Sequence, residues 1–170
     1  NWFVILKLFK MKTLFFLFIS IFAFQNVTLS EARKAYATAN ANKQNALNFY
    51  NELKNYSGNN QTILAYKGAA LALQSKYVGT KESKRENFTK GVGLIENAIK
   101  QEPYNLELRI IRLSIQENTP KMMKYKMNIN EDKNLILKSY NSQNSDIKQL
   151  IKSYSKSSKS FTDIEKNQLK

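Results

Sequence analysis

The sequence predicts an all-α fold in which about six to seven helices form an antiparallel array. After residue 30, apolar residues recur mostly at the i, i+3, i+4, i+7 spacing of amphipathic helices. The 170 residues include only five Gly and two Pro, too few for the turns of a sandwich or barrel of short strands. The chain is 42% hydrophobic and 24% charged, which is typical of a sequence that folds.

Residues 1–30 have the pattern of a signal peptide. Met11 is followed by a lysine and then by the apolar stretch 13–24. Thr28 and Ser30 are the small residues that signal peptidase requires two positions apart, so the pattern predicts cleavage after Ser30. Residues 1–10 are then interpreted as the product of a displaced start upstream of Met11.

This segment predicts export to the periplasm or cell envelope. Without Cys the protein is not expected to be a lipoprotein. An uncleaved anchor stays open as the alternative, because residues 2–24 are largely apolar. Such a span would place Lys7, Lys10 and Lys12 inside the bilayer, at a cost of several kcal/mol.

Residues 31–154 are expected to form a single helical domain. The first helix follows Ser30 as N-cap, and the second ends near Tyr56. Their apolar stripes are Ala32, Ala35, Tyr36 and Ala39, and then Ala46, Phe49, Tyr50 and Leu53.

A third helix is expected at 62–77 and a fourth at 85–101, with the charged residues 81–86 as their connection. Gly68 lies inside the third helix, where it costs about 1 kcal/mol relative to Ala. A close helix crossing that leaves no room for a side chain would compensate, so Gly68 is predicted to mark one. Pro103 prevents the fourth helix from continuing.

The fifth helix, residues 106–117, is apolar around most of its circumference and is expected to be covered on two sides. Arg109, Arg112 and Gln116 form one polar stripe on it. Two buried guanidinium groups need acids, and Asp132 in the next helix is the best candidate. The favoured interpretation is an internal ion-pair cluster that fixes two helices. A groove that presents arginines to a partner's carboxylate is the alternative.

The remaining segments are less regular. The sixth helix begins at Asn130 with acids in its first turn, and the seventh covers 146–154. Between 121 and 129, the residues Met122, Met123 and Met127 are expected to fill the core, with an adaptable contact surface as the alternative. The Lys/Ser-rich residues 155–170 are expected to form a flexible tail.

The absence of Cys and His removes many enzyme classes. It excludes thiolate nucleophiles, serine–histidine triads and sites built on histidine or cysteine metal ligands. Glu131 and Asp132 are interpreted as charges at a helix N-terminus rather than as a catalytic pair. No catalytic, cofactor-binding or metal-binding residues are predicted, so the protein is expected not to be an enzyme.

The formal net charge of +14 comes mostly from lysine. The only arginines are Arg33, Arg85, Arg109 and Arg112, although arginine is the residue preferred for phosphate and guanine contacts. Lys, Asn, Ile, Tyr and Phe all have A/T-rich codons, so base composition can raise the lysine content by itself. A solvated basic surface is expected, with no specific nucleic acid partner and at most weak binding to anionic surfaces.

Four residues near the fourth helix resemble the second helix of a tetratricopeptide (TPR) repeat. They are Gly91, Ile95, Ala98 and Pro103, at the spacings of that repeat. Gly68 resembles the small residue of the first TPR helix, but it lies nearly twice the usual distance before Gly91. The period of about 34 residues is therefore not sustained.

Residues 65–73 and 105–133 are also similar to a family of exported, uncharacterised TPR-like bacterial proteins. The resemblance implies an irregular TPR-like array with no known activity. The expected function is therefore a non-enzymatic scaffold or protein–protein interaction module for a protein or peptide partner. The alternative is a basic protein that binds anions or the envelope surface.

Overall fold

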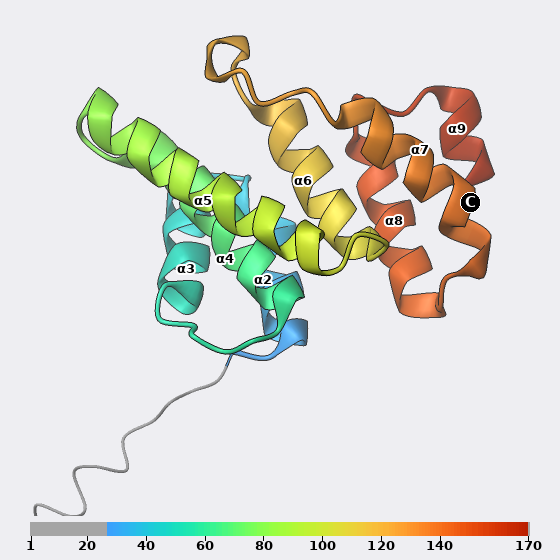
Figure 1. Cartoon of the computed structure of the whole chain (residues 1–170), viewed down its shortest axis with the longest axis horizontal. Coiled ribbons are helices and arrows are strands. Elements are labelled where there is room, and N and C mark those ends of the chain that lie inside the picture. Colours follow the sequence, from blue (N-terminus) through green and yellow to red (C-terminus); the bar gives the residue numbers. More distant parts are fainter. Residues whose placement is uncertain (1–26, 170) are drawn as a thin grey trace, which may run out of the picture.

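A computed structural model describes residues 27–169, which contain eight α-helices, three short 3₁₀ turns and no strand (Figure 1). The all-α prediction is confirmed, with more helices than expected. The helices are α2 Leu29–Ala39, α3 Lys43–Leu53, α4 Gln61–Gln74, α5 Lys81–Gln101, α6 Leu106–Asn118, α7 Ile129–Ser139, α8 Ser145–Ser157 and α9 Asp163–Gln168. The 3₁₀ turns are η1 Ser75–Tyr77, η2 Lys121–Met123 and η3 Tyr140–Ser142.

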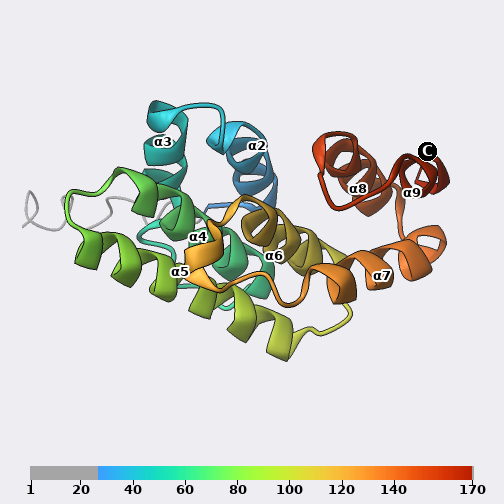
Figure 2. The same ribbon diagram turned by 90° about the horizontal axis from the view of Figure 1, so that it is seen from above.

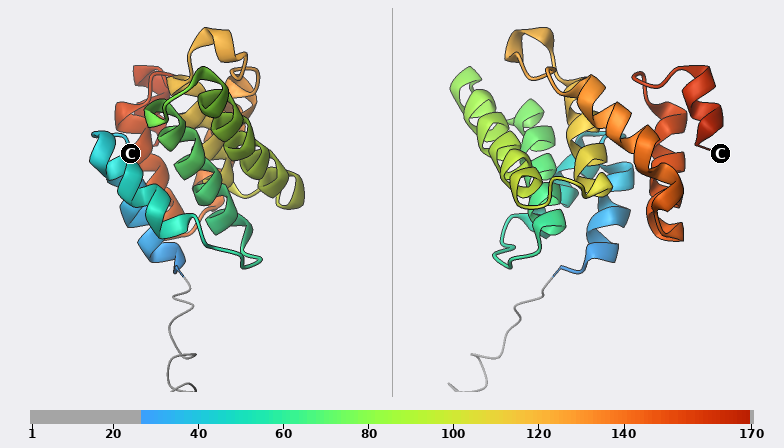
Figure 3. Two further views of the ribbon diagram at one scale, coloured as in Figure 1. Left: turned by 90° about the vertical axis from the view of Figure 1, so that its left-hand side faces the viewer. Right: turned by 45° about the vertical axis from the view of Figure 1, so that its right-hand side comes forward.

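Consecutive helices pair along the chain, as α2 with α3, α4 with α5, α6 with α7 and α8 with α9. The first members of these pairs also contact one another, in the order α2, α4, α6, α8. Figure 2 shows the pairs following one another across the molecule, and Figure 3 shows α4 beside α5. The even-numbered helices therefore form one continuous layer.

The buried apolar residues form two clusters that meet at α6. Leu108, Ile111 and Ile115 of α6 belong to the cluster made with α2 to α5. Leu106, Ile110 and Leu113 belong to the cluster made with α7, α8 and the C-terminal segment. The prediction that this helix is covered on two sides is confirmed, because each of its faces lies in a different core.

Helices α4 and α5 cross closely at Gly68 and Gly91. A Cβ atom at Gly68 would lie 2.4 Å from the carbonyl oxygen of Gly91, and one at Gly91 would lie 2.5 Å from that of Gly68. Both distances are too short for any side chain. The predicted crossing at Gly68 is confirmed, and Gly91 is its counterpart.

Helix α5 begins at Lys81 rather than near residue 85, so the expected connection 81–86 is helical. The Thr80 side chain caps it by accepting a hydrogen bond from the backbone N–H of Ser83, at 3.1 Å. This first turn therefore presents its lysines from a regular helix.

The expectation of a flexible tail is wrong for residues 155–169. Helix α8 continues to Ser157, and α9 follows with a capping box between Thr162 and Glu165. Phe161 and Leu169 are buried in the second core, and the Tyr140 hydroxyl donates a 3.1 Å hydrogen bond to the Leu169 carbonyl. Few apolar residues are needed here, because both enter a core that α7 and α8 have already built.

The methionines of residues 121–129 do not fill the core as expected. Met122 is 84% exposed and Met127 is 79% exposed. Met123 and Tyr125 pack against the first core, and the Tyr125 ring meets Phe88 edge to face at 5.8 Å. The connection is thus held by Met123 and Tyr125, which leaves the other two methionines in water.

The predicted signal peptide lies outside the described residues except for 27–30. Within that short piece, the Thr28 hydroxyl accepts a 3.3 Å hydrogen bond from the backbone N–H of Glu31 and caps α2. Val27 and Leu29 pack against the first core. Among residues 27–169, every helix is too short or too polar to cross a bilayer.

Gly68→Ala should lower the free energy of unfolding by about 1–3 kcal/mol, because the methyl group forces α4 and α5 apart. Gly93→Ala is the matched control, since a Cβ atom there meets nothing within 4 Å. The control should raise the free energy by about 0.5–1 kcal/mol through better helix propensity. Urea denaturation followed by circular dichroism measures both, and equal stabilisation by the two variants would contradict the close crossing.

Candidate functional site

Asp132 lies between the two arginines of α6. Its carboxylate is fully buried. It accepts hydrogen bonds from Arg112 Nε at 2.8 Å and Arg112 Nη2 at 2.6 Å, and from Arg109 Nη1 at 3.0 Å. The structure therefore brings together three of the four residues that the sequence selected, across the interface between α6 and α7.

The remaining donors of the two arginines are also engaged. Arg109 Nη1 contacts Glu131 at 2.6 Å, and its Nε and Nη2 donate to the carbonyl oxygen of Pro103. Arg112 Nη1 contacts Glu96 at 2.9 Å, and Glu96 in turn accepts a 2.6 Å hydrogen bond from the Tyr125 hydroxyl. The arginines are thus occupied by the protein's own acids, and the internal cluster is the arrangement that the structure contains.

In this cluster, burial and the neighbouring charges shift the pKa values of the ionisable groups in opposite directions. Burial raises the pKa of Asp132, while the hydrogen bonds and charges of Arg112 and Arg109 oppose that rise. Burial alone would lower the pKa of Arg112, but Asp132 and Glu96 raise it overall. The carboxylate and guanidinium groups depend on each other to stay charged out of water.

Gln116, the fourth residue of the predicted stripe, lies outside the cluster. Its Nε2 donates a 3.3 Å hydrogen bond to Asn128, at the start of α7. Its Oε1 is buried and has no hydrogen-bond partner among the described residues. Gln116 therefore joins the same two helices at a separate point.

A second buried network went unpredicted. Glu107 of α6 is 2% exposed and binds Arg33 of α2 through two hydrogen bonds of 2.7 and 2.6 Å. The Tyr66 hydroxyl of α4 donates to the same carboxylate at 2.7 Å, and burial together with the Glu107 charge raises the pKa of Tyr66. Three even-numbered helices are joined here, by residues too distant in sequence for spacing to reveal.

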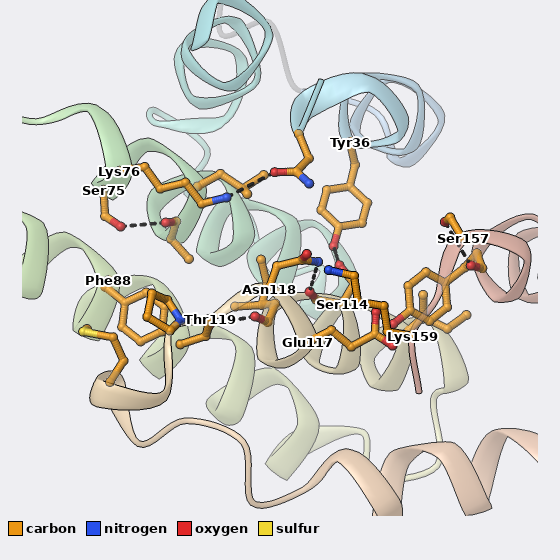
Figure 4. Close-up of a pocket in the computed structure, with 18 of the residues that line it drawn as sticks. Tyr36, Ser75, Lys76, Phe88, Ser114, Glu117, Asn118, Thr119, Ser157 and Lys159 are labelled. Carbon is orange, nitrogen blue, oxygen red and sulfur yellow. Dashed lines mark hydrogen bonds between the residues drawn. The ribbon is translucent and has the colours of Figure 1, made fainter. Parts of the chain in front are cut away.

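A groove of about 770 Å³ crosses the C-terminal halves of α2, α4, α6 and α8 (Figure 4). The start of α5 and the turn η2 complete its wall. Its apolar lining includes Leu73, Phe88, Ile110, Ile115, Met123 and Leu150. A groove of this size and lining is typical of binding sites.

Basic side chains surround the groove. They are Lys76, Lys81, Lys84, Arg85 and Lys159. None of the five forms an ion pair with any acid in residues 27–169. Glu117 is the one acid among the lining residues. The lining is therefore strongly positive.

Glu117 is already engaged by the C-terminal segment. Its carboxylate accepts hydrogen bonds from the Ser158 hydroxyl and, at 3.1 Å, from the backbone N–H of Ser160. The nearby Tyr154 hydroxyl is buried and has no hydrogen-bond partner among the described residues. Burial and the charge of Glu117 raise the pKa of Tyr154. Glu117 therefore holds one wall of the groove in place. The basic residues around the groove, which form its rim, are left without an acid partner in the described part of the chain.

Neutral polar groups lie at the middle of the groove. The Tyr36 hydroxyl shares a hydrogen bond with Ser114, and burial raises the pKa of Tyr36 to about 12. Asn118 Nδ2 donates to the Ser114 carbonyl at 2.9 Å, and Lys76 Nζ donates to Asn40 Oδ1 at 3.1 Å. Figure 4 shows Lys76 and Phe88 towards one end, Lys159 and Ser157 towards the other, and Asn118 between them.

The groove has the apolar lining and the polar groups of a binding surface. Within residues 27–169, no group of three or more acids is placed to hold a metal ion. The groove offers one engaged carboxylate, apolar surface, amides and unpaired cations. The sequence does not reveal this site, because its residues come from five separate segments. One of these segments contains the lysines of 81–86, which the sequence pattern predicts to be a connection.

Searches of known protein families, of curated proteins and of solved structures found no match to this chain. The resemblance to TPR proteins therefore stays a prediction.

Asp132→Asn should lower the free energy of unfolding by about 3–5 kcal/mol, because it leaves two buried guanidinium groups short of an acid. Arg112→Met should cost less, since Arg109 still neutralises Asp132. The double variant should fall short of the sum of the two losses by about 0.5–3 kcal/mol. Chemical denaturation of the four proteins measures this coupling.

Lys90→Met provides the control, because Lys90 and Glu86 form an exposed ion pair on α5. Its effect should stay within about 1 kcal/mol. Small and additive losses for Asp132→Asn and Arg112→Met would show that the internal cluster contributes little to stability.

Proposed function

We propose that this protein is an exported, non-enzymatic helical scaffold that binds a protein partner in the groove across α2, α4, α6 and α8. The observation that carries the proposal is the combination of an apolar lining with five unpaired basic side chains on one concave surface. Folded proteins rarely leave such a surface uncovered unless it contacts something else.

The helix arrangement supports a TPR-like interpretation. Successive pairs stack through their first helices, and Gly68 and Gly91 allow one pair to close tightly. In helical-repeat proteins, stacked pairs create extended concave surfaces that bind partners. The groove here lies on the layer formed by the first helices of the four pairs.

One observation favours the alternative, a protein that binds anionic envelope surfaces. The turn η2 exposes Met122 beside Lys121 and Lys124, and apolar side chains next to lysines can enter a lipid headgroup region. Lys124 also has a left-handed backbone, with φ of 51°, which turns the connection sharply. Met122 also lines the groove, whereas Lys121 and Lys124 lie outside its lining. Substitution of these two lysines can therefore separate the two functions.

Ala37→Trp should abolish partner binding by filling the groove while changing stability little, because Ala37 is an exposed groove residue of α2. Thr38→Trp is the matched control, at the next exposed position and outside the groove lining. Both proteins are used to capture partners from envelope extract, at about 50 and 300 mM NaCl. A partner retained equally by both variants would overturn the proposed groove function.

Export is proposed on the predicted signal peptide alone. N-terminal sequencing of the exported protein should find Glu31 first. A mature protein that retains residues 13–24 would instead be anchored.

Cleavage after Ser30 would also remove the Thr28 cap of α2. A chain of residues 31–170 should therefore be less stable than 27–170 by about 0.5–2 kcal/mol. Thr28→Ala in the longer chain should reproduce much of this loss in a thermal melt.

A further inference from the structure

We propose that the groove's occupant is an acidic peptide segment whose apolar side chains enter the groove while its carboxylates meet the basic rim; this rests on the proposed function. Three features of the groove support this occupant: the imbalance of charge, the environment of Lys76 and the concave shape.

The excess of cations is greater at the groove, with five cations to one acid, than in the whole chain, with 27 to 13. Five cations and one acid line the groove, and that acid, Glu117, is held by Ser158 and Ser160. Elsewhere in residues 27–169, the half-buried Arg33 and the buried Arg109 and Arg112 have acids of their own. Carboxylates of a ligand would give the rim cations the acid partners that the arginines already have within the protein.

Lys76 is a cation of the groove that has no carboxylate beside it in the described part of the chain. Its ammonium group donates to the neutral amide of Asn40 at 3.1 Å and has no acid partner in residues 27–169. Partial burial lowers the pKa of Lys76, so its ammonium group is less well solvated than in free water although the residue as a whole is exposed. A carboxylate beside Lys76 would remove this disadvantage and gain a charge-assisted hydrogen bond.

Shape and chemistry favour a peptide over a bilayer. The lining includes Ile110, which is only 2% exposed, and the half-buried Leu150, and a flat lipid surface cannot reach such residues. Single side chains such as Leu or Phe can enter it. The Asn118 side chain lies between the two ends of the groove, and its Oδ1 has no hydrogen-bond partner among the described residues. That oxygen can accept a backbone N–H of an extended peptide.

The test is a selection of phage-displayed random dodecapeptides on the full immobilised chain. The enriched peptides should combine an excess of Asp and Glu with Leu, Ile, Phe or Met. A synthetic peptide from the leading clone is then titrated by fluorescence anisotropy. Replacing its acids by Asn and Gln should weaken binding at least about tenfold, and so should raising the salt from about 50 to 300 mM.

Two charge-matched variants locate the interaction. Lys81→Glu with Lys84→Glu reverses two rim charges in the first turn of α5, where acids suit the helix dipole. Lys34→Glu with Lys43→Glu makes the same change in net charge at exposed positions outside the groove. The first pair should weaken peptide binding at least about tenfold, and the second less than about twofold.

The outcomes separate the two proposals. One outcome is that the enriched peptides lack an acidic excess and still fail to bind the Ala37→Trp variant. This result would overturn the acidic occupant and leave the groove function standing. Peptides whose binding ignores Ala37→Trp would overturn both. Failure to enrich any peptide, together with binding to phosphatidylglycerol vesicles that Lys81→Glu with Lys84→Glu abolishes, would replace the peptide with an anionic lipid surface.

Discussion

The fold depends on the burial of α6, a helix that carries charges into both cores. Glu107, Arg109 and Arg112 are all buried, so each needs a partner of opposite charge. The partners come from different helices: Arg33 from α2, Glu96 from α5, and Asp132 from α7. Apolar packing alone would let these helices slide along α6, whereas charge-assisted hydrogen bonds require particular positions. The cluster is best understood as a device that sets the register of neighbouring helices.

That register determines the groove. One face of α6 contributes Ile110, Ser114 and Asn118 to the groove lining. Arg109 and Arg112 hold the helix from the opposite face. Glu117 then holds the C-terminal segment against α6 through Ser158. The walls from α2 and α8 are thus positioned by contacts to one helix. A loss of those contacts would alter the shape of the groove before it altered the helices themselves.

The parts of this structure that the sequence predicted are those carried by local periodicity. The stripe of Arg109 and Arg112 on an otherwise apolar helix required an acid, and Asp132 was the nearest one that the next helix could bring inward. Gly68 was recognised because a glycine inside a helix needs a reason. In both cases a residue was unfavourable within its own helix, an arginine on an apolar surface or a glycine in the helix interior. The free-energy cost of that residue indicated that a particular partner had to compensate for it.

The features that were missed depend on contacts between distant segments. Arg33 and Glu107 are ordinary helix residues until the fold brings α2 against α6. Phe161 and Leu169 are isolated in a polar stretch, and only the finished core gives them a place. The groove is the extreme case, since five segments each contribute a few residues. No periodicity within one segment can reveal a surface that exists only between segments.

The two groups of cations in this protein differ in what surrounds them. The arginines of α6 are buried, so folding itself requires their acids to be present. The lysines of the rim remain in contact with water, which stabilises their charge without a partner. Lys76 is also exposed, but partial burial lowers its pKa and its ammonium group donates only to an amide. An acid from the chain at that point would stabilise the free protein but occupy the groove. Its absence leaves the site ready for an acid from elsewhere, and this connects the internal charge arrangement of the fold to the ligand that we propose.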